Sequence, residues 1–208
     1  YEASLLSMPE HLKQQLLYGN WDLMDGAAFP EFNQRDHVIE PFEIPHSWKR
    51  FRSCDYGYTS FAAVHWFAID PVYETLIVYR ELYVTKHTGK DLAAKVLELE
   101  KDERIMYGML DSSVWAMRGQ NGPSIAEEMI QMGCRWRPAD RTKGSRTAGK
   151  NRLHELLKLR DVGVREDNTI MYEPGIKIFN TCRQIISDLP TLPAHPDGAD
   201  DIDEKYTS

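Results

Sequence analysis

The chain has 208 residues, of which 42% are hydrophobic and 27% are charged, and its formal net charge is −7 at pH 7. This length and apolar content suit one α/β domain with appendages, and no apolar stretch is long enough for a membrane span or a signal peptide. Three widely spaced cysteines argue against a disulfide framework and a zinc site, and they indicate a reducing compartment. The sequence starts at Tyr1 without a methionine, so we expect a fragment of a longer protein.

The first fifty residues divide into a helical part and an extended part. Leucines recur near helical spacing within residues 1–25, at Leu5, Leu6, Leu12, Leu16 and Leu17. Residues 26–50 contain three prolines, which favour an extended connector that leads into the first strand.

Three strands are predicted next, over residues 51–55, 61–69 and 75–84, and their short loops imply an antiparallel meander. Thr88 then begins a helix, because Asp91 three residues later completes a variant of the capping box. A fourth strand, residues 105–110, follows this helix. A strand that is reached through a helical crossover is expected to lie parallel to the first strand, so both strands would end at the same edge of the sheet.

The remaining elements are mostly helical. Ser124 and Glu127 form a full capping box, and Gly133 is a natural end for the helix that they begin. We then expect a short strand at residues 134–136, a basic loop, a helix at 147–160, a small hairpin around 168–172 and a helix at 176–188. The predicted fold class is α/β: a mixed sheet, made of the antiparallel three-strand meander and of parallel strands, flanked by helices.

Both strands that are predicted to lie parallel end in an aspartate, Asp55 and Asp111. Carboxylates that converge from rigid strands are the ligands that a two-metal phosphodiester hydrolase needs, because its ions activate a water and neutralise the leaving oxygen. An aspartate at a strand end is also an ordinary turn former, and for either residue alone this is the better explanation. At equivalent ends of adjacent strands, the two explanations are evenly matched.

Basic residues concentrate in one segment despite the negative net charge. Residues 135–165 contain ten Arg and Lys and only three acids, a local balance of +7. Such a segment can bind the phosphates of a nucleic acid, although a solvated helix face explains it equally well. Residues 144–151 nearly match a nucleotide phosphate loop, but Asn151 stands where Ser or Thr would hold magnesium, so no ATP motor is predicted in these residues.

The end of the chain is acidic, since residues 197–204 contain five acids and no base. A solvated loop is the ordinary explanation of such a run. Its aspartates are nevertheless candidates for a third metal ligand.

Together, these segments resemble the C-terminal nuclease domain of the large terminase subunit of tailed bacteriophages. The similarity is carried by residues 17–22 with Phe29, by residues 55–57 and 110–112, by the basic residues 141–150 and by residues 197–201. Each element alone is weak, but their order and spacing over nearly the whole chain are fairly specific. The resemblance implies an RNase H-like fold and metal-dependent cutting of concatemeric double-stranded DNA during viral genome packaging.

The resemblance also implies roles for individual residues. Asp55 matches the first catalytic aspartate of the family and would bridge two Mg²⁺ or Mn²⁺ ions, and Asp111 matches the second and would hold one of them. The third metal ligand would be Asp203, with Asp200 or Asp201 as alternatives, or it would lie beyond Ser208. DNA binding would fall to the basic segment, at Arg141, Lys143, Arg146, Lys150 and Arg152.

A terminase also has a larger context. Residues 1–45 would be the connector from a missing ATPase domain, and residues 46–208 would form the nuclease domain with its acidic C-terminal loop. The ATPase domain, the small terminase subunit and the portal would be partners in the cytoplasm of the infected bacterial host. Two rival functions stay open: another RNase H-like nuclease, such as a junction resolvase or an RNase H, and a non-catalytic module that docks on DNA or on the portal.

Overall fold

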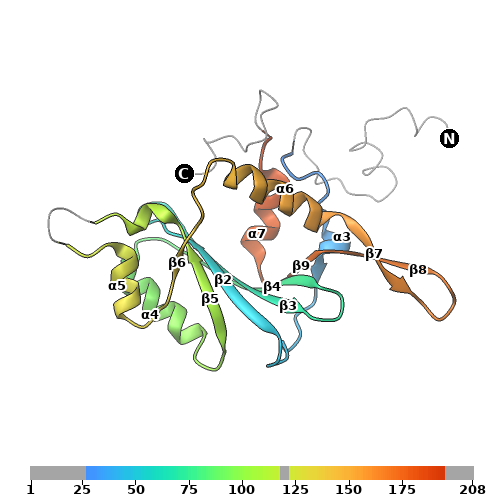
Figure 1. Cartoon of the computed structure of the whole chain (residues 1–208), viewed down its shortest axis with the longest axis horizontal. Coiled ribbons are helices and arrows are strands. Elements are labelled where there is room, and N and C mark those ends of the chain that lie inside the picture. The colour runs from blue at the N-terminus through green and yellow to red at the C-terminus, as the bar shows by residue number, and fades with distance from the viewer. Residues whose placement is uncertain (1–26, 118–121, 195–208) are drawn as a thin grey trace.

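The computed structural model describes residues 27–117 and 122–194 of the chain. Its centre is a seven-stranded sheet (Figure 1), formed by β1 (Val38–Ile39), β2 (Lys49–Asp55), β3 (Ala62–Asp70), β4 (Thr75–Val84), β5 (Ile105–Leu110), β6 (Arg137–Pro138) and β9 (Ile176–Phe179). The order across the sheet is β1-β9-β4-β3-β2-β5-β6. Strands β7 (Leu159–Val164) and β8 (Ile170–Pro174) form a separate hairpin, which extends away from the main sheet at the right of Figure 1.

Helices lie around the sheet (Figure 1). In this view α4 (Gly89–Leu99) and α5 (Ile125–Gln131) pack together beside β5, and α6 (Ser145–Leu157) and α7 (Arg183–Asp188) lie above the strands. The short elements are α3 (Gln34–His37) and the 3-10 turns η1 (Ser112–Trp115) and η2 (Leu189–Thr191). Within the described ranges, every helix is too short or too polar to cross a membrane.

Strands β2, β3 and β4 form the predicted antiparallel meander, and β5 lies parallel to β2 as predicted. Burial alternates along β2 and β3, because successive side chains of a strand point to opposite faces of the sheet. On one face Cys54, Val64 and Trp66 are buried in a cluster that also contains Leu92 of α4 and Met129 of α5. The opposite face of β2 and β3, the open face, carries half-exposed or exposed side chains.

A buried ion pair crosses the core between the sheet and the helices. Arg52 Nη1 donates to both carboxylate oxygens of Glu100, at 2.7 and 2.8 Å, and Arg52 Nη2 donates to the backbone oxygen of Arg135 at 2.7 Å. Trp66 Nε1 donates to the same carboxylate at 2.6 Å, and the guanidinium carbon lies 4.1 Å from the Trp136 ring centroid. The pair therefore links β2, the end of α4 and the segment that leads into β6.

The helix predicted at residues 176–188 is wrong in its first part. Residues Ile176–Phe179 form β9, which lies parallel between β1 and β4, and only Arg183–Asp188 is helical. Three of the four side chains of β9 are buried, so this apolar run fills the sheet. The short strand predicted at 134–136 is also displaced, to Arg137–Pro138, and the predicted small hairpin is longer, because it spans β7 and β8.

Residues 27–45 pack onto the folded unit. Phe29 and Phe32 are both 2% exposed, β1 pairs with β9, and Ala27 forms an isolated antiparallel bridge with Pro193. The extended connector predicted for residues 26–50 thus contains α3 and β1 instead. Residues 1–26 lie outside the described part, and a link from residues 1–45 to an ATPase domain stays a prediction.

Candidate metal and nucleic-acid site

The two predicted aspartates lie at adjacent strand ends. Cys54 of β2 is in register with Leu110 of β5, and the Asp111 N–H donates to the Cys54 carbonyl oxygen at 3.0 Å. Asp55 and Asp111 are the next residues of these two parallel strands. Because side chains alternate between faces, both carboxylates point away from the face on which Cys54 and Leu110 are buried, toward the open face of the sheet.

The charges of these carboxylates repel each other. The pKa of Asp55 is raised above its usual value, first because burial removes part of its hydration and second because of the negative charge of Asp111. The Ser113 hydroxyl donates to Asp111 Oδ2, and Arg141 Nη2 lies 4.0 Å from Asp111 Oδ1. Two mutually repelling carboxylates on rigid strands fit a divalent cation, since carboxylate oxygens are the ligands that Mg²⁺ and Mn²⁺ prefer.

A third carboxylate follows the neighbouring strand but does not join the pair. Strand β6 lies parallel to β5, and Asp140 comes two residues after β6 ends. Its oxygens accept hydrogen bonds from Thr142 N at 2.8 Å and from Thr142 Oγ1 at 3.0 Å, and the pKa of Asp140 is lowered by these bonds. In residues 27–117 and 122–194, no group of three or more His, Cys, Asp or Glu is placed to hold a metal ion. The third ligand predicted at Asp203, Asp200 or Asp201 falls outside the described residues.

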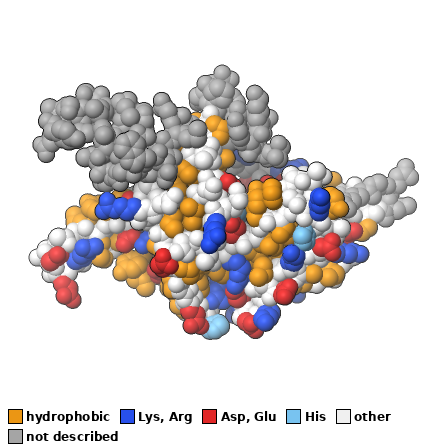
Figure 2. All heavy atoms as spheres, turned by 180° about the vertical axis from the view of Figure 1, so that it is seen from behind, with side chains coloured by type: hydrophobic (Ala, Val, Ile, Leu, Met, Phe, Trp, Pro, Cys, Tyr) orange, Lys and Arg blue, Asp and Glu red, His pale blue; other side chains and the backbone are white. Residues whose placement is uncertain are grey.

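The predicted DNA-binding residues lie in the loop after β6 and on α6. Arg141 and Lys143 are exposed in the loop, and Arg146, Lys150 and Arg152 follow on α6, where Lys150 is half-buried. Of the five, Arg141 is placed directly beside Asp111. Figure 1 shows α6 on the side of the sheet where β2 and β5 end. On the face seen in Figure 2, by contrast, basic and acidic side chains are interspersed among hydrophobic ones over the described part of the surface.

Helix α6 is anchored at its C-terminal end. His154 Nδ1 lies 2.9 and 3.0 Å from the two carboxylate oxygens of Glu31, and His37 Nε2 lies 2.8 Å from the backbone oxygen of Leu157. His37 and Leu157 are almost fully buried. The segment around α3 therefore holds the basic helix against the rest of the fold.

An aromatic row that we did not predict runs along the open face. The Phe51 ring centroid lies 5.0 Å from that of Phe67 and 5.1 Å from that of Tyr107, with interplanar angles of 13° and 12°. Arg137 lies over Tyr107, with its guanidinium carbon 5.7 Å from the ring centroid. Phe51 precedes Asp55 by four residues, so the alternation of β2 places both on the same face. This period-two pattern could have identified the row in the sequence.

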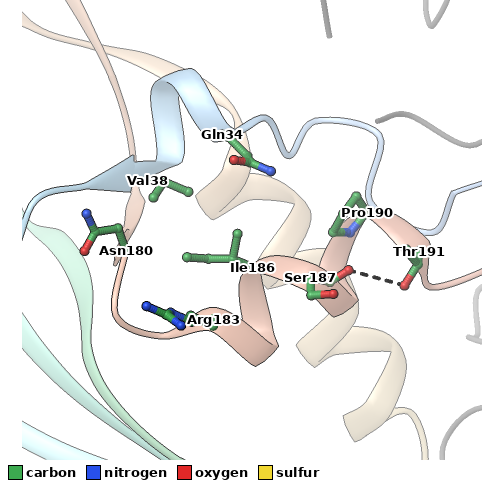
Figure 3. A pocket seen from close by; sticks show the side chains of 8 residues that line it. All are labelled: Gln34, Val38, Asn180, Arg183, Ile186, Ser187, Pro190 and Thr191. Atoms are coloured by element: carbon green, nitrogen blue, oxygen red, sulfur yellow. Dashed lines mark hydrogen bonds between the residues drawn. The ribbon is translucent and has the colours of Figure 1, made fainter. Parts of the chain in front are cut away.

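A cavity of about 450 Å³ lies between α3 and α7 (Figure 3), far from the aspartates. Val38, Ile186 and Pro190 supply its apolar lining, and Arg183 and Asn180 lie at its side. It borders β1 and β9, whereas Asp55 is on β2, three strands from β9 in the sheet. With strands spaced roughly 4.8 Å apart, this separation is about 15 Å or more. The cavity is therefore not part of the candidate site.

No family model matches the sequence, and no curated protein is similar to it in sequence. Solved structures do share its fold. A large terminase from a thermophilic bacteriophage matches with a TM-score of 0.61 at 14% identity, over 95% of this chain and 47% of that one. The P22 large terminase nuclease domain matches with a TM-score of 0.56 at 14% identity, over 86% and 84%. The large terminase nuclease from the thermophilic phage G20c with bound zinc matches with a TM-score of 0.53 at 16% identity, over 84% and 91%.

This chain thus spans about half the length of the first of these large terminases and most of the length of the two separate nuclease domains. At these identities the likeness establishes the fold. The chain has the RNase H-like fold of phage large terminase nuclease domains, a mixed sheet flanked by helices, and this prediction is confirmed.

Proposed function

We propose that this chain, which has the fold of large terminase nuclease domains, is a metal-dependent endonuclease domain that cuts concatemeric double-stranded DNA during viral genome packaging. One observation carries the proposal: Asp55 and Asp111 end two adjacent parallel strands, close enough for the charge of Asp111 to raise the pKa of Asp55. The zinc bound in the G20c nuclease structure supports the use of a divalent metal by a domain with this fold.

The residues at the strand ends have different roles in the proposed reaction. Two divalent ions, Mg²⁺ or Mn²⁺, would supply an activated water and neutralise the leaving oxygen. Asp55 and Asp111 would hold them, with a third carboxylate from Asp203, Asp200 or Asp201. The Ser113 hydroxyl orients the Asp111 carboxylate by donating to Oδ2. Because both aspartates extend from hydrogen-bonded strands, their backbone positions are fixed before metal or DNA binds.

The loop after β6 and helix α6 would bind the DNA backbone. Four of the five basic side chains are exposed, and Arg141 lies beside Asp111. The backbone of α6 lies on the side of the sheet where β2 and β5 end (Figure 1). Cutting a packaged concatemer needs little sequence readout at this domain, so contacts to phosphates would dominate. The net charge of −7 does not oppose this role, since a phosphate responds to the local balance of +7 over residues 135–165.

Salt dependence tests this surface. Arg146 and Lys150 lie one helical turn apart on the same face of α6. We expect their double substitution by Ala to reduce the magnitude of the slope of log association constant against log salt concentration by about 2, because each lost phosphate contact removes roughly 0.9. The measurement is fluorescence anisotropy of a labelled duplex over a range of NaCl concentrations. Lys49→Ala with Lys101→Ala removes the same charge at the opposite end of the sheet and should leave the slope unchanged. A slope that is already flat in the wild type excludes the DNA role of α6.

The proposal also includes a further domain and the partners of the whole protein. A preceding ATPase domain, connected through residues 1–45, would drive packaging, and the small terminase subunit and the portal would bind the whole protein in the cytoplasm of the infected host. The first large terminase named above is about twice as long as this chain, which supports the presence of a further domain.

Nicking of supercoiled plasmid in Mn²⁺ tests the activity. We expect the wild type to nick and both Asp55→Asn and Asp111→Asn to lose at least 100-fold in rate, whereas Asp102→Asn in the turn before β5 stays active. Equal behaviour of Asp55→Asn and the wild type would favour the non-catalytic docking module. Faster cutting of four-way junctions or of RNA–DNA hybrids than of duplex DNA would favour the resolvase or RNase H alternatives.

A further inference from the structure

One basic side chain approaches the paired aspartates. Within residues 27–117 and 122–194, Arg141 is the cationic residue that comes within 4.0 Å of either carboxylate, through Nη2 to Asp111 Oδ1. Its side chain is 63% exposed, and that of Asp111 is 32% exposed. The other oxygen of Asp111 accepts the hydrogen bond from Ser113. Arg141 therefore faces the one oxygen of Asp111 that Ser113 leaves available.

The backbone beside Arg141 is fixed, whereas its side chain is not. Ala139 N donates to the Leu110 carbonyl oxygen at 2.9 Å, so the chain stays joined to β5 past the end of β6. Asp140 then closes a turn through Thr142, and Ser145 Oγ donates to the Asp140 carbonyl oxygen at 3.1 Å. Arg141 lies between these anchored residues. Its exposed guanidinium can leave Asp111 by rotation of the side chain alone.

We propose that Arg141 is a placeholder cation that occupies the Asp111 side of the site until DNA and metal arrive, an inference that rests on the proposed nuclease function. A guanidinium beside Asp111 offsets the repulsion between the two carboxylates. A divalent ion bound to the same oxygen repels that guanidinium, since both are positive. The two cations therefore compete for Asp111, and Arg141 weakens metal binding in the free protein.

DNA reverses this competition. A guanidinium pairs well with a phosphate, with two parallel hydrogen bonds to its oxygens. When a DNA phosphate engages Arg141, Asp111 is released for the metal, and by linkage a bound metal strengthens DNA binding by the same factor. The site thus favours loading its ions when a substrate is present.

Calorimetric titration of the 208-residue chain with Mn²⁺, without DNA, tests the competition directly. We expect Arg141→Ala to bind Mn²⁺ roughly two- to fivefold more tightly than the wild type, the range given by an exposed ion pair. Lys143→Ala, two residues away in the same exposed loop, removes the same charge and should change the affinity less than half as much on a logarithmic scale. Arg141→Gln, which keeps a long polar stem, should behave like Arg141→Ala.

A second arm uses a phosphorothioate duplex, which resists hydrolysis. At a concentration that saturates each of the three proteins, the duplex should tighten Mn²⁺ binding more in the wild type and in Lys143→Ala than in Arg141→Ala, because only the first two retain Arg141 for a phosphate to draw away from Asp111. Equal gains in all three proteins overturn the proposal.

The Asp55→Asn variant separates the two levels of inference. If Mn²⁺ binds the wild type and not Asp55→Asn, the metal site stands, and equal affinities of Arg141→Ala and Lys143→Ala then overturn the placeholder role alone. If Mn²⁺ binds the wild type and Asp55→Asn alike, the proposed nuclease site and the placeholder role fall together.

Discussion

Asp55 is both the centre of the proposed site and a source of instability in the folded protein. Its carboxylate loses hydration and faces Asp111, and both effects raise its pKa. A group whose pKa is raised on folding favours the folded state while it is protonated, below its unfolded pKa of about 3.9. This contribution is lost as the pH rises through the folded pKa, so at neutral pH the ionised side chain opposes folding.

Replacing Asp55 by Asn should therefore stabilise the metal-free protein at pH 7 and change little below about pH 3, where the carboxylate is protonated in both the folded and the unfolded chain. The gain should stay below about 1 kcal/mol, because the site is solvent-exposed. Thermal denaturation in EDTA at several pH values measures it, with Asp102→Asn as a control of equal charge. Saturating Mn²⁺ should reverse the order, since ligand binding stabilises only the protein that retains the site. A difference that does not vary with pH would contradict this account.

Among the elements, β6 depends on its neighbours for its position. It has only two residues, and Trp136 just before it packs over β5 because Gly108 has no side chain. A Cβ at Gly108 would lie 2.6 Å from the Trp136 ring and 2.9 Å from Arg52 Nε. The bond from Arg52 to the Arg135 carbonyl oxygen fixes the same segment. Together these contacts place the following loop, with Arg141, beside Asp111.

The change Gly108→Ala should lower the free energy of unfolding by about 1–3 kcal/mol, because Trp136 or Arg52 must move. The matched change Gly149→Ala, in α6, meets nothing within 4 Å. It should raise the free energy of unfolding by up to about 1 kcal/mol, since alanine favours a helix interior over glycine. Urea denaturation measures the free energy of unfolding of both variants. A Gly108→Ala variant as stable as the wild type would exclude tight packing of Trp136 over β5.

At the scale of the whole molecule, the charges are divided between separate segments. The basic residues concentrate at 135–165 and five acids at 197–204, so the net charge of −7 describes neither. Two carboxylates are present at the strand ends, and two-metal catalysis needs further oxygen ligands. The acidic segment remains the predicted source of a third carboxylate.

Changing Asp200, Asp201 and Asp203 together to Asn should weaken Mn²⁺ binding and lower the rate of plasmid nicking by at least tenfold, because the metal ions would lose a ligand. The charge-matched control neutralises three acids of the β7–β8 hairpin, at Asp161, Glu166 and Asp167. If the triple Asn variant cuts at the full wild-type rate, a three-carboxylate site built from these residues is refuted.

The arrangement of the aspartates could be predicted from sequence because it follows from local rules. A capped helix between two strands implies a parallel crossover, and parallel neighbours end at the same edge. Thr88 and Ser124 do cap their helices, through side-chain bonds to the backbone N–H groups of Asp91 and Glu127. These rules place the ends of both strands at the same edge of the sheet, whereas the pairing of β5 with β2 rather than with β4 does not follow from them.

The parts that could not be predicted depend on distant contacts. The four residues of β9, three apolar ones and Lys177, fit the start of a longer helix as well as a buried strand, and only their pairing with β4 and β1 decides for the strand. Arg141 comes beside Asp111 because Arg52, Glu100 and Trp136 meet in the core. The contact between these three residues cannot be predicted from their spacing in the sequence, because it depends on how the end of α4 packs against the sheet.

Strand β1 is synthesised early, but the strand that pairs with it, β9, is synthesised late. Val38 pairs with Ile178, about 140 residues further along the chain, whereas β2 and β5 can pair once residue 111 has emerged from the ribosome. A nascent chain would thus bring its two aspartates together while Phe29, which packs on His154 of α6, and Phe32 remain uncovered. Exposed aromatic side chains beside an unpaired strand edge promote aggregation. Slow translation, or truncation before β9, would therefore lower the yield of soluble protein even when Asp55 and Asp111 have come together at the ends of β2 and β5.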